Sequence, residues 1–155
     1  MKVLMVCLGN ICRSPMAEGI LEARSKDAGL AWEVDSAGTM HYHAGEPPHQ
    51  QSQLTAKKNG IDISEQRCRQ FTADDIRYFD HIYVMDSDNY AAVQKICGQN
   101  WQPAKVSRIL DVLYPGEQRN VPDPYYGTEK DFEDVYQLLD RACQKIVDNY
   151  LQGKG

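Results

Sequence analysis

The chain has 155 residues, of which 42% are hydrophobic and 25% are charged. These values are ordinary for a globular protein and exclude collagen, low-complexity disorder and a coiled coil. Lys and Arg number 17 and Asp and Glu number 22, which gives a formal net charge of −5. That charge argues against binding to nucleic acid or to an anionic membrane, so an anionic substrate would need a local site. The length predicts one domain over residues 1–155.

The N-terminal apolar run is too short for a membrane span of about 20 residues. No small-residue cleavage site follows it, so a signal peptide is not expected either. The five cysteines are odd in number and widely spaced, unlike a secreted disulfide framework. We therefore expect a cytoplasmic protein with mostly free thiols.

Four segments are predicted as strands, and they cover residues 2–8, 32–36, 81–85 and 105–110. The first, third and fourth are apolar with little alternation, which suits strands of a parallel sheet covered on both faces. Helical segments lie between the strands. The alternation predicts an α/β fold.

The first helix is expected to start with Ser14 as its N-cap and Pro15 as its first residue, and to end near Ala28 before Gly29. Three further short segments are predicted as helical: residues 50–59, a turn over 72–76, and 87–97 with Ser87 or Asp88 as its cap. The last helix has the clearest pattern, because apolar residues recur at helical spacing from Phe132 to Tyr150. Thr128 and Asp131 approximate a capping box ahead of it. Two long irregular stretches remain, residues 38–49 and 114–127.

The segment after the first strand carries the chemistry. It reads Cys7-Leu8-Gly9-Asn10-Ile11-Cys12-Arg13-Ser14-Pro15 and lies between a strand and a helix N-terminus. A loop of this kind can turn its N–H groups around a tetrahedral anion. Gly9 permits unusual backbone angles, Asn10 tolerates the left-handed region, and Arg13 offers a planar fork for phosphate. Ser14 can donate its hydroxyl to the Cys7 sulfur while capping the helix.

These donors favour a negatively charged Cys7, so a thiolate nucleophile is expected at the bottom of an oxyanion cradle. Cys7 is the one cysteine of the five that has an arginine six residues later. The alternative is a buried cysteine with Arg13 on an exposed helix face. That alternative would leave the occurrence of four residues in this segment unexplained, namely Gly9, Asn10, Ser14 and Pro15.

The run from Val3 to Glu18 resembles the low-molecular-weight protein tyrosine phosphatases. The blocks Val34 to Thr39 and Asp123-Pro124-Tyr125-Tyr126-Gly127 resemble that family's second strand and acid loop, and the resemblance covers the whole chain. It implies a three-layer, flavodoxin-like (Rossmannoid) sandwich. We expect a four-stranded parallel sheet in the order 2-1-3-4, with the phosphate loop after the first strand, since right-handed crossovers leave few other arrangements.

The resemblance also implies a mechanism for hydrolysis of phosphotyrosine. Cys7 would attack phosphorus to form a phosphocysteine, Arg13 would bind the phosphoryl oxygens, and Asp123 would act as general acid and then base. A phenol with a pKa near 10 benefits from such a proton donor. Ser36 would brace the loop through Asn10, and Ser14 would assist the thiolate.

Two aromatic walls are expected around the substrate ring: Tyr125, by resemblance, and Tyr42, at a variable family position. Leu8 is expected at the floor or side of the pocket. The full set expected to contact substrate is Leu8, Gly9, Asn10, Ile11, Cys12, Ser14, Tyr42 and Tyr125.

Cys12 matches a family cysteine that can form a reversible disulfide with the nucleophile, and its alternative role is packing. Cys143 is expected in the core, while Cys68 and Cys97 have no assigned role. His41, His43 and His49 could suggest a metal site, but no cysteine or carboxylate completes a set. Neither metal nor cofactor is expected.

The main alternative is a thiol-dependent arsenate reductase, which shares the loop but needs a relay of nearby cysteines. Another is a non-catalytic phosphate-binding or phosphotyrosine-binding module, against which the intact Cys7, Arg13 and Asp123 argue. The expected partners are phosphotyrosine proteins or peptides, with phosphate and other oxyanions as inhibitors. The resemblance implies a monomer with weak self-association.

Overall fold

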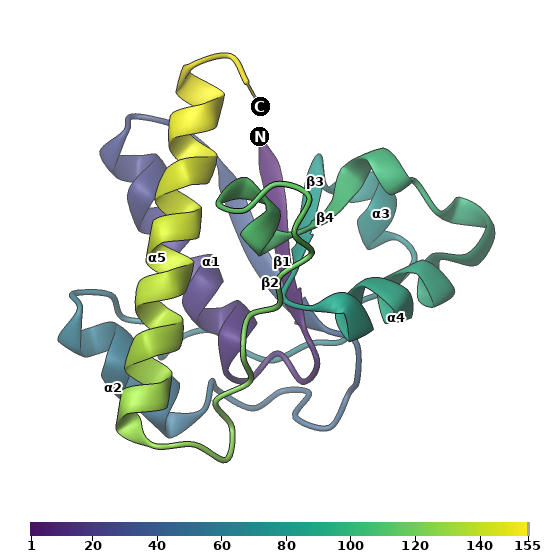
Figure 1. Ribbon diagram of the computed structural model, residues 1–155. Coiled ribbons are helices and arrows are strands. Elements are labelled where there is room, and N and C mark those ends of the chain that lie inside the picture. Colours follow the sequence, from purple (N-terminus) through teal and green to yellow (C-terminus); the bar gives the residue numbers. More distant parts are fainter. Residues whose placement is uncertain (155) are drawn as a thin grey trace.

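A parallel four-stranded sheet in the order β2-β1-β3-β4 forms the centre of the protein, with helices on both faces (Figure 1). The computed structural model describes residues 1–154. The strands are β1 (Lys2–Cys7), β2 (Glu33–Gly38), β3 (His81–Val84) and β4 (Val106–Arg108). The α-helices are α1 (Arg13–Asp27), α2 (Gln50–Lys58), α3 (Asp75–Tyr78), α4 (Ser87–Cys97) and α5 (Glu129–Leu151). Short 3-10 turns cover Gly98–Asn100, Pro103–Lys105 and Ile109–Val112. The predicted fold class and strand order are confirmed.

Alternation along β1 separates two cores. Val3 and Met5 face α1 and α5, whereas Leu4 and Val6 face α3 and α4, because successive side chains of a strand point to opposite faces. All four side chains are fully buried. This explains the unbroken apolar run of the first strand, since each face of the sheet is covered by helices.

The N-cap prediction holds for α5 and fails for α1 and α4, whereas α1 ends before Gly29 as predicted. Thr128 and Asp131 form the reciprocal capping box of α5. Ser14 is not the N-cap of α1: the helix starts at Arg13, after Cys12, and the Ser14 hydroxyl is engaged beneath the loop instead. In α4 the cap is Asp86, which accepts from the Asn89 N–H, rather than Ser87 or Asp88.

β1 and β3 each end one residue earlier than predicted, and β2 and β4 differ more. β2 begins one residue later than predicted and continues to Gly38, where it pairs with Cys7. β4 is only three residues long, because the chain turns into a 3-10 helix at Ile109. The apolar residues Ile109 and Leu110 are buried against α5 rather than within the sheet.

The carboxyl end of β1 is the switch point of the sheet. The chain leaves β1 for β2 on one side, and β3 lies on the other side of β1. Ligands of open α/β sheets bind at such a point, because the flanking connections diverge there and leave a crevice. The loop after β1 lies at the end of the molecule opposite the chain termini (Figure 1).

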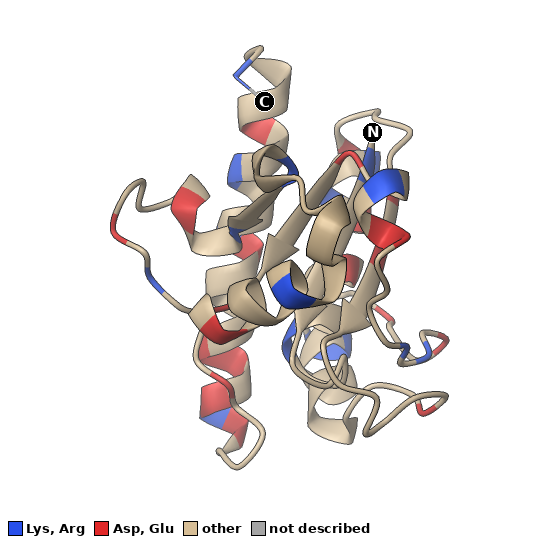
Figure 2. Ribbon diagram, turned by 90° about the vertical axis from the view of Figure 1, so that its right-hand side faces the viewer, with Lys and Arg blue, Asp and Glu red and all other residues tan. Residues whose placement is uncertain are grey.

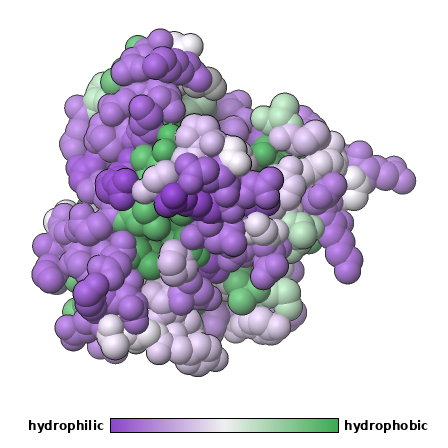
Figure 3. All heavy atoms as spheres, viewed as in Figure 1, coloured by the Kyte–Doolittle hydropathy of each residue, from purple (hydrophilic) through white to green (hydrophobic). Residues whose placement is uncertain are grey.

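Charges of both signs are distributed over the ribbon, and acidic residues gather along α5 (Figure 2). In the view of Figure 3, apolar surface forms a narrow band within a mostly hydrophilic face. Within residues 1–154, no helix combines the length and apolar character that crossing a membrane requires.

His81, at the start of β3, predicts a pH dependence of stability. Burial lowers its pKa to about 4, while its Nε2 lies 2.8 Å from Ser107 Oγ on β4. In the unfolded chain His81 binds a proton near pH 6.5, whereas in the folded chain it does so only near pH 4. The free energy of unfolding therefore falls as the pH drops from about 6.5 to 4. We expect a loss of about 2–3 kcal/mol over that window, and a weaker pH dependence in His81→Gln. Urea unfolding of both proteins at several pH values measures it, and equal slopes would contradict the assignment.

Candidate active site

The loop of residues 8–12 joins Cys7, the last residue of β1, to Arg13, the first residue of α1. Asn10 has φ 55°, which confirms that it occupies the left-handed region. Gly9 does not, so the conformational reason expected for that glycine is wrong. A Cβ at Gly9 would instead lie 3.2 Å from the His43 ring. Among the described residues, the N–H groups of residues 9–11 have no protein acceptor, which leaves them available to an oxyanion.

Asn10 braces the loop from beneath. Its Nδ2 donates to Ser14 Oγ at 2.8 Å and to Ser36 Oγ at 2.9 Å. Ser14 Oγ lies 3.1 Å from Cys7 Sγ. Because the Ser14 oxygen already accepts from Asn10, its hydrogen is free to be donated to the sulfur. All of these side chains are buried.

Two segments distant in sequence close the underside of the loop. A Cβ at Gly38 would lie 2.8 Å from Asn10 N, so only glycine lets β2 approach so closely. Cys68 Sγ donates to the Asn10 carbonyl at 2.7 Å, and the Arg69 N–H donates to Asn10 Oδ1 at 2.9 Å. Cys68, which had no role assigned from sequence, therefore holds the loop backbone.

Arg13 is buried and fixed by groups that follow the sheet. Its Nη1 donates to Asp86 Oδ2 at 2.7 Å and to the Val121 carbonyl at 3.0 Å. Sequence reasoning missed Asp86. Its position just after β3 was the available signal, since the carboxyl ends of parallel strands meet at one edge. Asp86 also caps α4, so one carboxylate orients both a helix and the guanidinium.

Asp123 lies beside this arginine, at the rim of the pocket. Its Oδ2 is 3.7 Å from Arg13 Nη2, and its Oδ1 accepts the Tyr125 N–H at 3.1 Å. The side chain is 45% exposed, so it can exchange protons with solvent. The loop that carries it is joined to the sheet by the Val121 N–H, which donates to the Met85 carbonyl at 2.8 Å.

A pocket of about 270 Å³ opens above Cys7. Tyr42 and Tyr125 both line it, 65% and 37% exposed respectively, and Leu8 lies at its side. The lining also includes Gly9, Ile11, Cys12, Arg13, His43, Asp123 and Tyr126. The side chains of Asn10, Ser14 and Ser36 are not part of the lining and lie below it. The structure thus divides the expected contact residues into a pocket wall and a supporting layer.

Two histidines support the wall and were assigned no such part from sequence. His43 Nδ1 lies 3.0 Å from Glu46 Oε2. His49 packs between Tyr125 and Phe132, at centroid distances of 5.6 and 5.1 Å, and its Nδ1 caps α2 through the Gln51 N–H. Burial lowers the pKa of His49 and favours this neutral, accepting form. No group of three or more metal-ligating side chains occurs in the part of the chain that the structure describes.

The thiol next to Arg13 belongs to Cys12, which is buried. Burial, followed by the negative charges of Cys7 and Asp123, raises the pKa of Cys12 to about 12. Cys12 thus stays protonated at neutral pH. Cys143 is fully buried in the core, as expected. All five cysteines are free thiols.

The arrangement can bind a tetrahedral oxyanion, present a sulfur nucleophile to it, and supply a carboxyl group on the outer side. The pocket above it is narrow and has aromatic walls, which suits a planar ring attached to the oxyanion. These elements come from four separate parts of the chain: the loop after β1, the segment after β2, the start of α4, and the segment before α5.

Comparison with known proteins agrees with this geometry. A Synechocystis protein named as a low molecular weight protein-tyrosine-phosphatase is 44% identical, over 95% of this chain and 94% of its own. The low molecular weight phosphotyrosine protein phosphatase of Gallus gallus is 39% identical, over 94% and 93%. A solved protein tyrosine phosphatase from Entamoeba histolytica superimposes with a TM-score of 0.91 at 35% identity, covering 100% and 99% of the two chains. The family model for low molecular weight phosphotyrosine protein phosphatases matches residues 2–154, and the chain belongs to that family.

Proposed function

We propose that the protein hydrolyses phosphotyrosine in proteins or peptides, and other aryl phosphates, by way of a phosphocysteine on Cys7. The Cys7 sulfur forms a bond to phosphorus as the bond to the phenolic oxygen breaks, and Asp123 gives its proton to the departing oxygen. Water then attacks phosphorus, Asp123 takes its proton, and the S–P bond breaks to release phosphate. Arg13 and the loop N–H groups bind the phosphoryl oxygens throughout.

One observation carries this proposal most directly: Cys7, Arg13 and Asp123 line the same pocket, although they are up to 116 residues apart in the sequence. Arg13 is held in place by Asp86 and by the Val121 carbonyl. Positioning supplies most of the catalysis in phosphoryl transfer, so a fixed guanidinium supports the assignment.

Substrate selection is proposed to depend on the depth of the pocket and its aromatic walls. Tyr42 and Tyr125 would hold a phenyl ring between them, while a phosphoserine is too short to reach Cys7 past the rim. Phosphate and similar oxyanions are proposed as inhibitors, because they would occupy the loop alone. The exposed Leu8, Tyr42 and Tyr126 around the mouth support a monomer that self-associates weakly.

We further propose redox control in a reducing, cytoplasmic compartment. Peroxide would oxidise the Cys7 thiolate to a sulfenic acid. The neighbouring Cys12 thiol would then displace water to form a disulfide, which a dithiol reduces. Support comes from the five free thiols and from Cys12, which lines the same pocket as Cys7.

The nucleophile is tested with Cys7→Ser, which should abolish hydrolysis of p-nitrophenyl phosphate without added metal while the fold survives. A serine hydroxyl stays protonated in the same place. Arg13→Lys should also lose most activity, since an ammonium cannot replace the planar fork. Near-normal turnover in either folded variant would contradict these roles. Arsenate reduction exceeding phosphatase turnover in the wild type would favour the reductase alternative.

The general acid is tested with Asp123→Asn. With phosphotyrosine, kcat should fall by about 10²–10⁴, the range typical of general acid–base catalysis. Phosphorylation of Cys7 by p-nitrophenyl phosphate should suffer less, because the nitrophenolate leaves without a proton. Stopped-flow rates over leaving groups of different pKa give the comparison. A mutant-to-wild-type ratio that is the same for every leaving group would show that Asp123 is not the proton donor.

The disulfide is tested by brief peroxide treatment followed by dithiothreitol. The wild type should lose activity and regain it, and mass spectrometry should detect a Cys7–Cys12 crosslink. Cys12→Ser should be inactivated as well but recover less, because its sulfenic acid proceeds to irreversible forms. Equal recovery of the two proteins would leave Cys12 a packing residue.

A further inference from the structure

A buried glutamate lies at the far end of the hydrogen-bond network beneath the loop. Ser36 Oγ donates to Glu18 Oε1 at 2.6 Å, and Glu18 on α1 is only 9% exposed. Four hydrogen bonds therefore connect Glu18 to Cys7, by way of Ser36, Asn10 and Ser14. Glu18 itself touches neither the pocket nor the sulfur.

The direction of these hydrogen bonds follows from the number of hydrogens each group carries. The Asn10 amide nitrogen only donates, and its Oδ1 is occupied by the Arg69 N–H. Both serine oxygens therefore accept from Asn10, and each serine must direct its single hydrogen elsewhere. For Ser14 the available acceptor is Cys7, and for Ser36 it is Glu18.

We propose that Glu18 is a positioning residue for Cys7: as the acceptor of the Ser36 hydrogen, it keeps the Ser36 oxygen turned toward the Asn10 amide, which holds Ser14 in place to donate to the Cys7 sulfur. This inference rests on the proposed role of Cys7 as a thiolate nucleophile. Without an acceptor at Glu18, the Ser36 hydrogen has no partner in this buried site, and the hydroxyl turns away from Asn10 to find one. The Asn10 amide would then lose one of its two acceptors and hold Ser14 less firmly.

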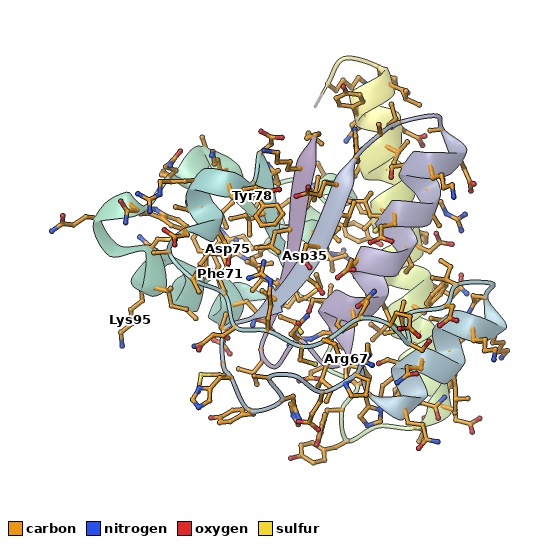
Figure 4. The ribbon with its side chains drawn as sticks, turned by 180° about the vertical axis from the view of Figure 1, so that it is seen from behind. Asp35, Arg67, Phe71, Asp75, Tyr78 and Lys95 are labelled. Atoms are coloured by element: carbon orange, nitrogen blue, oxygen red, sulfur yellow. The ribbon has the colours of Figure 1, made fainter. Side chains whose placement is uncertain are left out.

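Glu18 lies beside a groove between α1 and the segment of residues 61–66. A Cβ at Gly19 would lie 2.6 Å from Ile63 Cγ2, so this glycine allows the segment of residues 61–66 to pack on α1. The same groove contains the charged groups Glu18, Glu22, Lys26, Asp62 and Glu65. On the sheet side Asp35 of β2 approaches, and Arg69 binds it together with Asp75 of α3; Figure 4 labels both aspartates.

The pKa of Glu18 follows from its burial and its neighbours. Burial raises the pKa of Glu18 to about 8. The carboxylates of Glu22 and Asp35 raise it as well, whereas the hydrogen bond from Ser36 lowers it. A proton on Glu18 can reside on Oε2, which leaves Oε1 to accept from Ser36. The acceptor is thus present in both protonation states of Glu18, and Ser36 keeps its partner.

The test measures alkylation of Cys7 by iodoacetate as a function of pH, because only the thiolate reacts. Glu18→Met removes both oxygens with little change in shape. We expect the midpoint to rise by roughly 0.5–1 pH unit, the size of one hydrogen bond to the charged form. The acid limb of kcat/KM should move by the same amount. Glu18→Gln should behave as the wild type, since its amide oxygen accepts from Ser36 and its nitrogen donates to Glu22.

Glu22→Met is the matched control, because it removes a carboxylate from the same helix face and leaves the acceptor of Ser36 in place. Loss of negative charge alone favours the thiolate, so a purely electrostatic effect would lower the midpoint in the Met variants or leave it unchanged, and would not raise it. The proposal requires a rise in Glu18→Met and no rise in Glu22→Met. An unchanged or lowered midpoint in Glu18→Met would overturn it.

Ser36→Ala tests whether the effect passes through Ser36. The double variant Ser36→Ala, Glu18→Met should shift the midpoint no further than Ser36→Ala alone, whereas additive shifts would contradict the proposal. If Glu18→Met does not fold, Glu18→Ala replaces it in both comparisons with the same expectations. Failure of the proposed function has a separate signature, namely a wild-type Cys7 that alkylates only at alkaline pH.

Discussion

The left-handed backbone of Asn10 is the constraint on which the site depends. Most side chains resist this conformation, and here it persists because every polar group of the Asn10 side chain and its carbonyl are bound. The partners come from α1, β2 and the segment that contains Cys68 and Arg69. The loop shape is therefore imposed by the packed sheet and helix layers.

A second set of contacts ties the outer parts of the site to the sheet. Asp86 follows β3 and holds Arg13, and the Val121 carbonyl binds the same guanidinium nitrogen. Val121 lies two residues before Asp123, so the arginine links the loop after β1 to the segment that carries Asp123. His49 supports Tyr125 in the same way by packing against its ring. The loop, the guanidinium and the Asp123 segment are thus held in one rigid framework.

The sequence was sufficient for the fold class, the strand order and the helix with the strongest apolar period. It also singled out Cys7 and Arg13, because a local pattern marks a strand followed by a loop and a helix, whereas Asp123 was selected through the resemblance to a family; all three line one pocket. It could not place Asp86, Cys68 or Glu18, whose contacts join residues 18 to 73 positions apart. The Ser14 cap failed for a different reason: within the same segment, the Ser14 hydroxyl is bound to Asn10 and to the Cys7 sulfur instead of to the helix N-terminus.

The distribution of charge has a kinetic consequence for substrate capture. The arginine of the pocket, Arg13, is buried within a chain of net charge −5, and basic residues elsewhere are interspersed with acidic ones (Figure 2). Electrostatic steering requires an extended field of one sign at the surface. A phosphorylated protein therefore reaches this site by diffusion and local fit. Added salt screens the net repulsion between two acidic partners and does not slow their encounter.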